Sequence, residues 1–138
     1  MSTQVEFLVR EYVVGWRWHD KSRVAAVVAY DCHVVESDGS EYSSRDAILR
    51  WLDHWVASGS KVEEWTISSL LADEAGACAE WQFTCVCCGN RSSFRGASVF
   101  RVRNGKITSV TEYRREKMPN QLPRATGQEK VSDQTAAS

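Results

Sequence analysis

The spacing of apolar residues changes once along this chain, from a helical period to the two-residue period of β-strands. Before Gly59, apolar side chains recur three and four positions apart, which is typical of amphipathic helices. This pattern predicts helices at 3–18, at 21–30 and between Ser43 and Gly59, with one short strand at 33–36. The later alternation predicts strands at about 62–71, 77–87, 93–103 and 106–115, with a hairpin turn at Asn104-Gly105. Segregated helices and strands predict an α+β fold, in which three helices pack on the concave face of a curved, mostly antiparallel sheet.

The length and charge of the chain limit what it can be. Its 138 residues predict one domain over 1–117, followed by a disordered or loosely attached tail at 118–138 that is rich in small polar residues. The 17 basic and 18 acidic side chains leave no positive surplus for binding nucleic acid. No apolar run approaches the roughly 20 residues that cross a bilayer, and the N-terminus shows no apolar signal sequence. We therefore expect a cytoplasmic protein that binds neither nucleic acid nor membrane.

Five cysteines raise the question of a metal site. Cys85, Cys87 and Cys88 lie close together, but Cys88 leaves the strand face that the other two share, and Cys78 is too distant to join them. Zinc sites usually take two separated pairs of ligands, so we predict small core residues and no metal. The sequence also lacks the motifs of nucleotide, flavin and metal enzymes, which predicts an activity without a cofactor.

The order of elements and several local strings resemble a known superfamily. The strings are FLVREYVVGWRWHD at 7–20, DCHVVESDG at 31–39, SRDAILRWLDHW at 44–55 and SFRGASVFRVRNGKITSVTEYRRE at 93–116. In these segments the chain resembles the SnoaL-like polyketide cyclases and ketosteroid isomerase-like proteins of the nuclear transport factor 2-like superfamily. The resemblance implies a cone-shaped α+β barrel with a pocket inside it, and usually a homodimer packed sheet to sheet.

The resemblance also implies roles for three positions. In the isomerase branch, a tyrosine on the first helix donates a hydrogen bond to the developing enolate, and Tyr12 stands at that place. An aspartate after the first strand takes the proton, and that position reads Ser37 here. A protonated acid on the strand at 93–103 completes the oxyanion hole, and that position reads Ser98. Because serine is a poor base and a weaker donor than a carboxylic acid, steroid isomerisation of the usual kind is not expected.

Glu112 is the acid with the strongest claim to a catalytic role. Strand alternation places it on one face with Val110 and Arg114, and the resemblance implies that this face looks into the cone. Beside aromatic walls the pKa of Glu112 would rise, as the role of a general base requires. The alternative is a structural ion pair between Glu112 and Arg114, which would oppose that rise.

Two further residues are candidates for proton chemistry. His33 shares a strand face with Val35 and Ser37, and an imidazole on an inward face would shuttle a proton, whereas on an outward face it would be structural. Tyr12 lies on the buried stripe of the first helix, where its hydroxyl needs a partner. That partner is a substrate carbonyl, Glu112, His33 or a water. We therefore predict Tyr12, His33 and Glu112 as catalytic residues.

The combined hypothesis is a cofactor-independent isomerase, cyclase or lyase. It would act by general acid–base chemistry on a small apolar or aromatic substrate that carries a carbonyl or hydroxyl group. The predicted substrate-binding residues are Trp16, Ser37, Trp55, Trp81, Phe83, Ser98, Phe100, Val110 and Arg114. The alternative is a non-catalytic protein of the same fold that binds a ligand or scaffolds a dimer. In either case the weakly charged outward face of the sheet predicts a two-fold homodimer.

Overall fold

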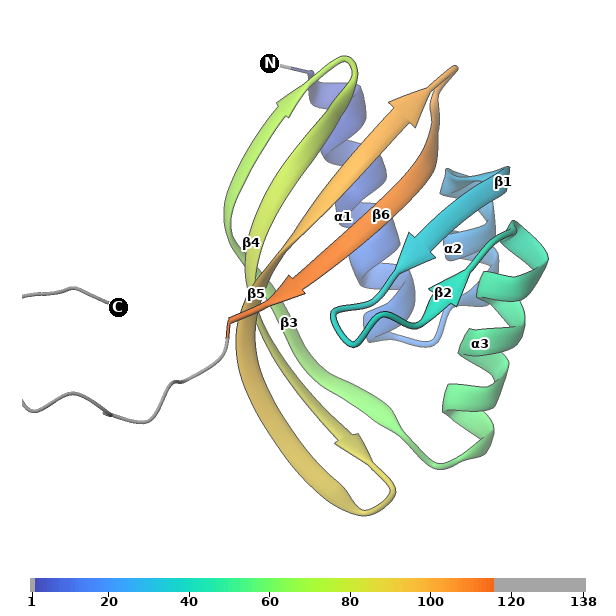
Figure 1. Ribbon diagram of the computed structural model, residues 1–138, viewed down its shortest axis with the longest axis vertical. Coiled ribbons are helices and arrows are strands. Elements are labelled where there is room, and N and C mark those ends of the chain that lie inside the picture. Colours follow the sequence, from blue (N-terminus) through green and yellow to red (C-terminus); the bar gives the residue numbers. More distant parts are fainter. Residues whose placement is uncertain (1, 116–138) are drawn as a thin grey trace, which may run out of the picture.

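The computed structural model describes residues 2–115, which form three helices and a six-stranded sheet (Figure 1). The helices are α1 (Thr3–Arg17), α2 (Lys21–Val27) and α3 (Arg45–Ala57). The strands are β1 (Val28–Val35), β2 (Glu41–Tyr42), β3 (Lys61–Asp73), β4 (Gly76–Cys87), β5 (Asn90–Arg103) and β6 (Lys106–Arg114). The predicted α+β class, with a curved sheet in the form of an open cone, is confirmed. Among the described residues, no helix has the length and apolar character needed to span a membrane.

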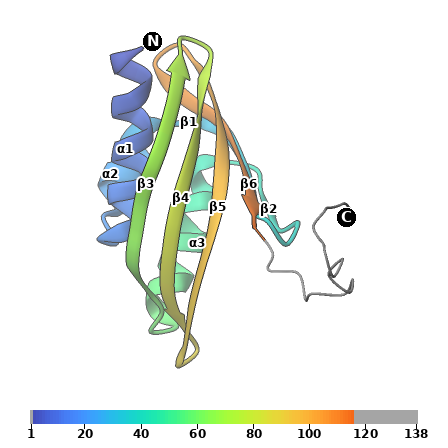
Figure 2. The same ribbon diagram turned by 90° about the vertical axis from the view of Figure 1, so that its left-hand side faces the viewer.

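The sheet is mixed, with the strand order β2-β1-β6-β5-β4-β3. β1 runs parallel to β6, and every other neighbouring pair is antiparallel. Register shifts interrupt the β1–β6, β3–β4 and β5–β6 ladders, and such irregularities bend a sheet. Figure 2 shows this bending: the long strands β3, β4 and β5 curve, and the helices lie on one side of them. The helices therefore cover the concave face of the sheet.

Helix α1 supplies a large part of the core. Ser2 caps it by accepting a hydrogen bond from the backbone N–H of Val5 at 3.2 Å. Its buried stripe consists of Val5, Leu8, Val9, Tyr12, Val13, Gly15 and Trp16. A Cβ added at Gly15 would lie 2.5 Å from a methyl carbon of Val24 on α2, so glycine is what permits the close contact between the two helices. This packing fixes the position of Tyr12 on the inner side of α1.

The structure differs from the prediction at the first strand. Helix α2 ends at Val27, and β1 begins at Val28 rather than at His33. Val28 pairs with Ile107 of β6, and neither side chain is exposed to solvent. Burial in a ladder therefore outweighs the helical spacing of the valines, which as β-branched residues suit a strand better than a helix. The short strand β2 was also not predicted.

The hairpin between β5 and β6 is confirmed. Asn104 and Gly105 have φ angles of 53° and 74°, the left-handed pair that a tight hairpin turn of this kind needs. The predicted tail at 118–138 lies outside the described residues.

Candidate functional site

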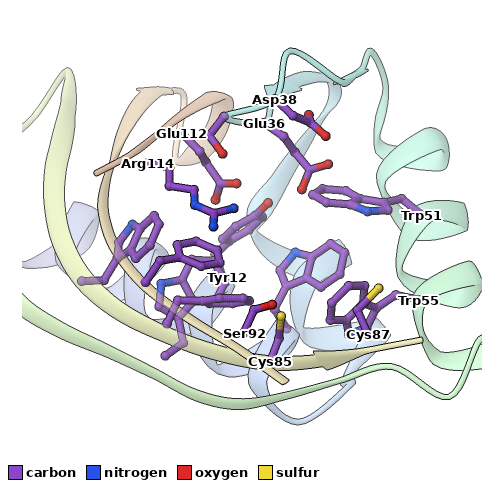
Figure 3. A pocket seen from close by; sticks show the side chains of 16 residues that line it. Tyr12, Glu36, Asp38, Trp51, Trp55, Cys85, Cys87, Ser92, Glu112 and Arg114 are labelled. Atoms are coloured by element: carbon purple, nitrogen blue, oxygen red, sulfur yellow. The ribbon is translucent and has the colours of Figure 1, made fainter. Parts of the chain in front are cut away.

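The helices and the concave face of the sheet enclose a cavity of about 350 Å³, a size typical of small-molecule sites. The aromatic residues that line it are Tyr12, Trp16, Trp51, Trp55, Trp65, Trp81, Phe83 and Phe94. The other lining residues are Glu36, Ser37, Asp38, Cys85, Cys87, Ser92, Glu112 and Arg114. Figure 3 shows that the carboxyl groups gather on one side of the cavity, across from the thiols of Cys85 and Cys87. The cavity is therefore apolar over most of its wall and carries its carboxyl groups, together with the guanidinium of Arg114, on one side (Figure 3).

Two carboxyl groups enter the cavity side by side, that of Glu112 from β6 and that of Glu36 from the residue directly after β1. In the parallel pair of β1 and β6, Val34 lies opposite Val110, and both side chains are fully buried. Glu36 and Glu112 each follow two residues later, so strand alternation places both on the same inward face. Neighbouring strands lie about 4.8 Å apart, which brings the two carboxyl groups to the same end of the cavity (Figure 3). The inward position of Glu112 agrees with the predicted alternation, whereas Glu36 was not predicted.

Both carboxyl groups hold their protons more tightly than usual. Burial, with a smaller effect from the charge of Glu36, raises the pKa of Glu112 to about 8. Burial, with a smaller effect from the charge of Asp38, raises the pKa of Glu36 to about 7. The pKa of Asp38 is lowered, because the backbone N–H of Ser40 donates a hydrogen bond to it. At a pH between the two pKa values, the carboxyl group of Glu112 is mainly protonated and that of Glu36 is mainly ionised. The pair can therefore donate one proton and accept another.

Tyr12 provides a hydrogen-bond donor between the two carboxyl groups (Figure 3). Its side chain is 1% exposed, and its ring packs edge-on against Phe100 and Trp65 at centroid distances of 5.8 and 6.3 Å. Burial raises the pKa of the Tyr12 phenol well above its ordinary value, and negative charge at Glu112 adds to the effect. The hydroxyl therefore keeps its proton across the neutral range, and the packed ring holds it in one place.

Ser98 connects Glu112 to the aromatic wall. The indole N–H of Trp81 donates to the hydroxyl oxygen of Ser98 at 2.9 Å, and that hydroxyl donates to Oε2 of Glu112 at 3.5 Å. Because Ser98 accepts from Trp81, its single proton is directed to Glu112. Gly96 makes room for this arrangement, since a Cβ there would lie 2.5 Å from the ring of Trp81. Ser98 is fully buried and does not line the cavity, so it acts on the site through Glu112 rather than on a substrate.

His33 does not reach the cavity, which corrects the prediction that it shares the site with Tyr12. The inward positions of β1 are Cys32 and Val34, both fully buried, so His33 lies on the opposite face. There its Nε2 lies 3.0 Å from Oε1 of Glu41 on β2, and both side chains are exposed to solvent. Of the two faces that the sequence left open for His33, the structure shows the outward one, because Cys32 and Val34 fill the inward positions of β1.

The other predicted residues divide into two groups. Those that line the cavity are Trp16, Ser37, Trp55, Trp81, Phe83 and Arg114, the last with its guanidinium carbon 4.0 Å from the ring centroid of Phe94. Phe100 and Val110 do not line it, which corrects their predicted contact with a substrate. They are 1% and 0% exposed, because Phe100 packs under Tyr12 and Val110 pairs with Val34.

Sequence reasoning missed Glu36, Asp38, Trp51, Trp65, Cys85, Cys87, Ser92 and Phe94 as lining residues. For Glu36 a signal was present, because it continues the alternating series of Cys32 and Val34. Trp51 stacks on Tyr42 at a centroid distance of 4.0 Å and borders the cavity. Over residues 2–115, no group of three or more His, Cys, Asp and Glu side chains is arranged to hold a metal ion.

No curated protein matches the sequence. An LEH-like epoxide hydrolase of M. tuberculosis has a similar structure, with 20% identity, a TM-score of 0.75 and coverage of 83% of this chain and 84% of that one. A protein of Catenulispora acidiphila with a ketosteroid isomerase-like fold has 20% identity and a TM-score of 0.66, over 77% of this chain and 83% of its own.

A third similar structure is an NTF2-like protein of Burkholderia pseudomallei, with 14% identity, a TM-score of 0.70 and coverage of 83% of this chain and 92% of that one. At these identities the structural likeness establishes the fold and nothing further. The sequence model of the SnoaL-like domain matches residues 9–110, which is most of the chain. The chain therefore belongs to the SnoaL-like domain family.

Proposed function

We propose that this protein is a cofactor-independent acid–base enzyme that moves a proton within a small, largely apolar molecule carrying a carbonyl group. The observation that carries the proposal is the pair of carboxyl groups at one end of an aromatic cavity, with pKa values raised to about 7 at Glu36 and about 8 at Glu112. A pair whose pKa values bracket a narrow range near neutrality offers a base and an acid at the same pH.

The geometry suggests a role for each group. The carboxylate of Glu36 takes a proton from the carbon next to the substrate carbonyl, and the electron pair moves to the carbonyl oxygen. The hydroxyl of Tyr12 and the protonated carboxyl of Glu112 donate hydrogen bonds to that oxygen as its charge develops. Return of the proton to another carbon completes an isomerisation, and attack by the enolate carbon within the same molecule completes a cyclisation. Loss of a leaving group completes a lyase reaction, so all three reaction classes share the first step.

This assignment explains the two serines that differ from the isomerase pattern. Ser37 stands where a base was expected, and Glu36 supplies a carboxyl group from the preceding residue. Ser98 stands where a protonated acid was expected, and it donates a hydrogen bond to Glu112, which carries a proton itself. The two missing groups are thus replaced by neighbours in space, which supports catalysis over the non-catalytic alternative.

The shared first step can be tested without the natural substrate. The probe is 2-tetralone, a flat aromatic ketone with exchangeable protons beside its carbonyl. In D2O the protein should accelerate incorporation of deuterium at these carbons, followed by NMR. Glu36→Gln keeps the shape of the side chain and removes the base, so the catalysed rate should fall by roughly 10²–10⁴. The matched control is Glu74→Gln in the exposed turn before β4, which should leave the rate unchanged.

If tetralone binds, as shown by quenching of tryptophan fluorescence, but wild type and Glu36→Gln exchange its protons equally slowly, the cavity binds ligands without acting on them. The non-catalytic reading of the family fold would then hold.

A further inference from the structure

The end of the β4–β5 hairpin carries thiols that the proposed acid–base chemistry does not use. Cys85 and Cys87 point into the cavity from β4 (Figure 3), and Cys88 follows in the turn. Cys88 and Gly89 have φ angles of 56° and 81°, so the chain reverses there in a left-handed turn. Cys85 is buried, Cys87 is half-buried and Cys88 is exposed. The pair of Cys87 and Cys88 therefore lies at the edge of the cavity, with one thiol toward the interior and the other toward solvent.

The two sulfur atoms are spaced for a shared ligand. Sγ of Cys87 lies 3.7 Å from Sγ of Cys88, and both thiols are free. An atom that bonds sulfur at about 2.3 Å, the length of a zinc–sulfur bond, would bridge this 3.7 Å gap with an angle of about 107° at its centre. That angle is close to the one that a tetrahedral or pyramidal centre prefers. The turn thus presents two soft donors that need no large movement to bind one atom.

Two thiols suit an atom that needs only two further bonds. Within residues 2–115, no third His, Cys, Asp or Glu completes a metal cluster at this turn. A closed zinc site needs four ligands, so two thiols do not suffice for it. A trivalent arsenic atom that already carries one organic group needs two more bonds, and a thiol is a soft donor that suits a soft centre of this kind.

We propose that Cys87 and Cys88 form a dithiol site that chelates a monosubstituted arsenic(III) group at the edge of the cavity. The reaction of an aryl arsenic dihydroxide balances without an oxidant. Two S–H and two As–OH bonds break, two As–S bonds form, and two water molecules leave while arsenic stays trivalent. Because Cys87 lines the cavity, the aryl group can extend toward its aromatic wall. The site is independent of Glu36 and Glu112.

The test uses the full chain and phenylarsine oxide, with intact-mass spectrometry as the readout. Wild type should gain one phenylarsenic group with the loss of two hydrogens, and the adduct should survive 2-mercaptoethanol but not 1,2-ethanedithiol. Cys87→Ser and Cys88→Ser each leave one thiol of the pair, so the affinity should fall by roughly 10²–10⁴, as the second bond is no longer intramolecular. The control is Cys78→Ser, which removes an exposed thiol elsewhere on β4 and should leave the affinity unchanged.

Two results would overturn the proposal. If Cys88→Ser keeps the wild-type affinity while Cys85→Ser loses it, the chelating pair is Cys85 and Cys87, and the turn plays no part. If every single variant keeps the adduct, or if 2-mercaptoethanol strips it from wild type, no dithiol site exists. Circular dichroism on each variant confirms that the fold is intact, so that a lost adduct reports on the thiols.

Discussion

Replacing Glu112 by glutamine should stabilise the protein at alkaline pH. In the folded chain the pKa of Glu112 lies at about 8, against an ordinary value of 4.5. Between these values the native state keeps a proton that the unfolded chain has released. Stability must therefore fall as the pH rises through this range, and the loss is complete above the folded pKa. Glutamine has the same shape and no proton to lose, so the variant should escape this penalty.

The size of the effect follows from the pKa. Each pKa unit corresponds to about 1.4 kcal/mol, so a rise from 4.5 to about 8 sets a ceiling of about 5 kcal/mol. Domains are commonly stable by only about 5–15 kcal/mol, so the difference should be large enough to measure. At about pH 5 the wild-type carboxyl is still protonated when folded, and the two proteins should differ by a much smaller amount.

The assay is urea denaturation of both proteins, followed by tryptophan fluorescence at about pH 5, 7 and 9, which spans the folded pKa. The expected result is a stability difference in favour of Glu112→Gln that grows with pH. Glu74→Gln, the control in the exposed turn, should show no such trend. A variant that is less stable than wild type at alkaline pH would refute the reasoning. It would mean that the Glu112 carboxylate is held by a cation such as Arg114, and that the ion-pair alternative is correct.

Four further results are expected. The rate of tetralone exchange should peak between about pH 7 and 8, because Glu36 must be ionised and Glu112 protonated. Ser98→Ala should move the alkaline limb of that profile to higher pH, since it removes a hydrogen bond that lowers the pKa of Glu112, and Ser98→Thr should restore it. Tyr12→Phe should slow exchange less than Glu36→Gln does, which steady-state rates will show. Light scattering at micromolar concentration should give a dimer that Val99→Lys, on the outward sheet face, weakens.

Much of the fold was predictable because local patterns and long-range packing agree in most of the chain. The two-residue period of β4 and β5 correctly placed Trp81 and Ser98 on inward faces, since a strand with one buried face tolerates no slip of register. For Glu112 the period grouped it with Val110 and Arg114, and the family resemblance supplied the inward direction. Asn104-Gly105 predicted its hairpin for a purely local reason, the left-handed φ angles of the turn.

The site was predicted less completely, and one uncertainty lay at the boundary between α2 and β1. Val27 and Val28 fit either a helix stripe or a buried strand, and only the pairing of Val28 with Ile107 decides between them. The predicted strand at 33–36 left out buried Cys32, so the sequence did not show that the face of Val34 and Glu36 is the inward one. The raised pKa of Glu36 was also out of reach, because it depends on burial that a sequence alone does not reveal.

The parallel ladder between β1 and β6 has a consequence for how the molecule acquires its chemistry. Val34 and Val110 are far apart in the sequence, so their pairing closes a long loop. Contacts of such separation carry a high loop-closure entropy and tend to form late. During synthesis the N-terminal elements, with Tyr12 and Glu36, emerge long before Glu112. A partly folded chain in which β6 has not yet paired with β1 therefore has Glu36 but not Glu112 in place. The return of catalytic activity during refolding would report the docking of β6.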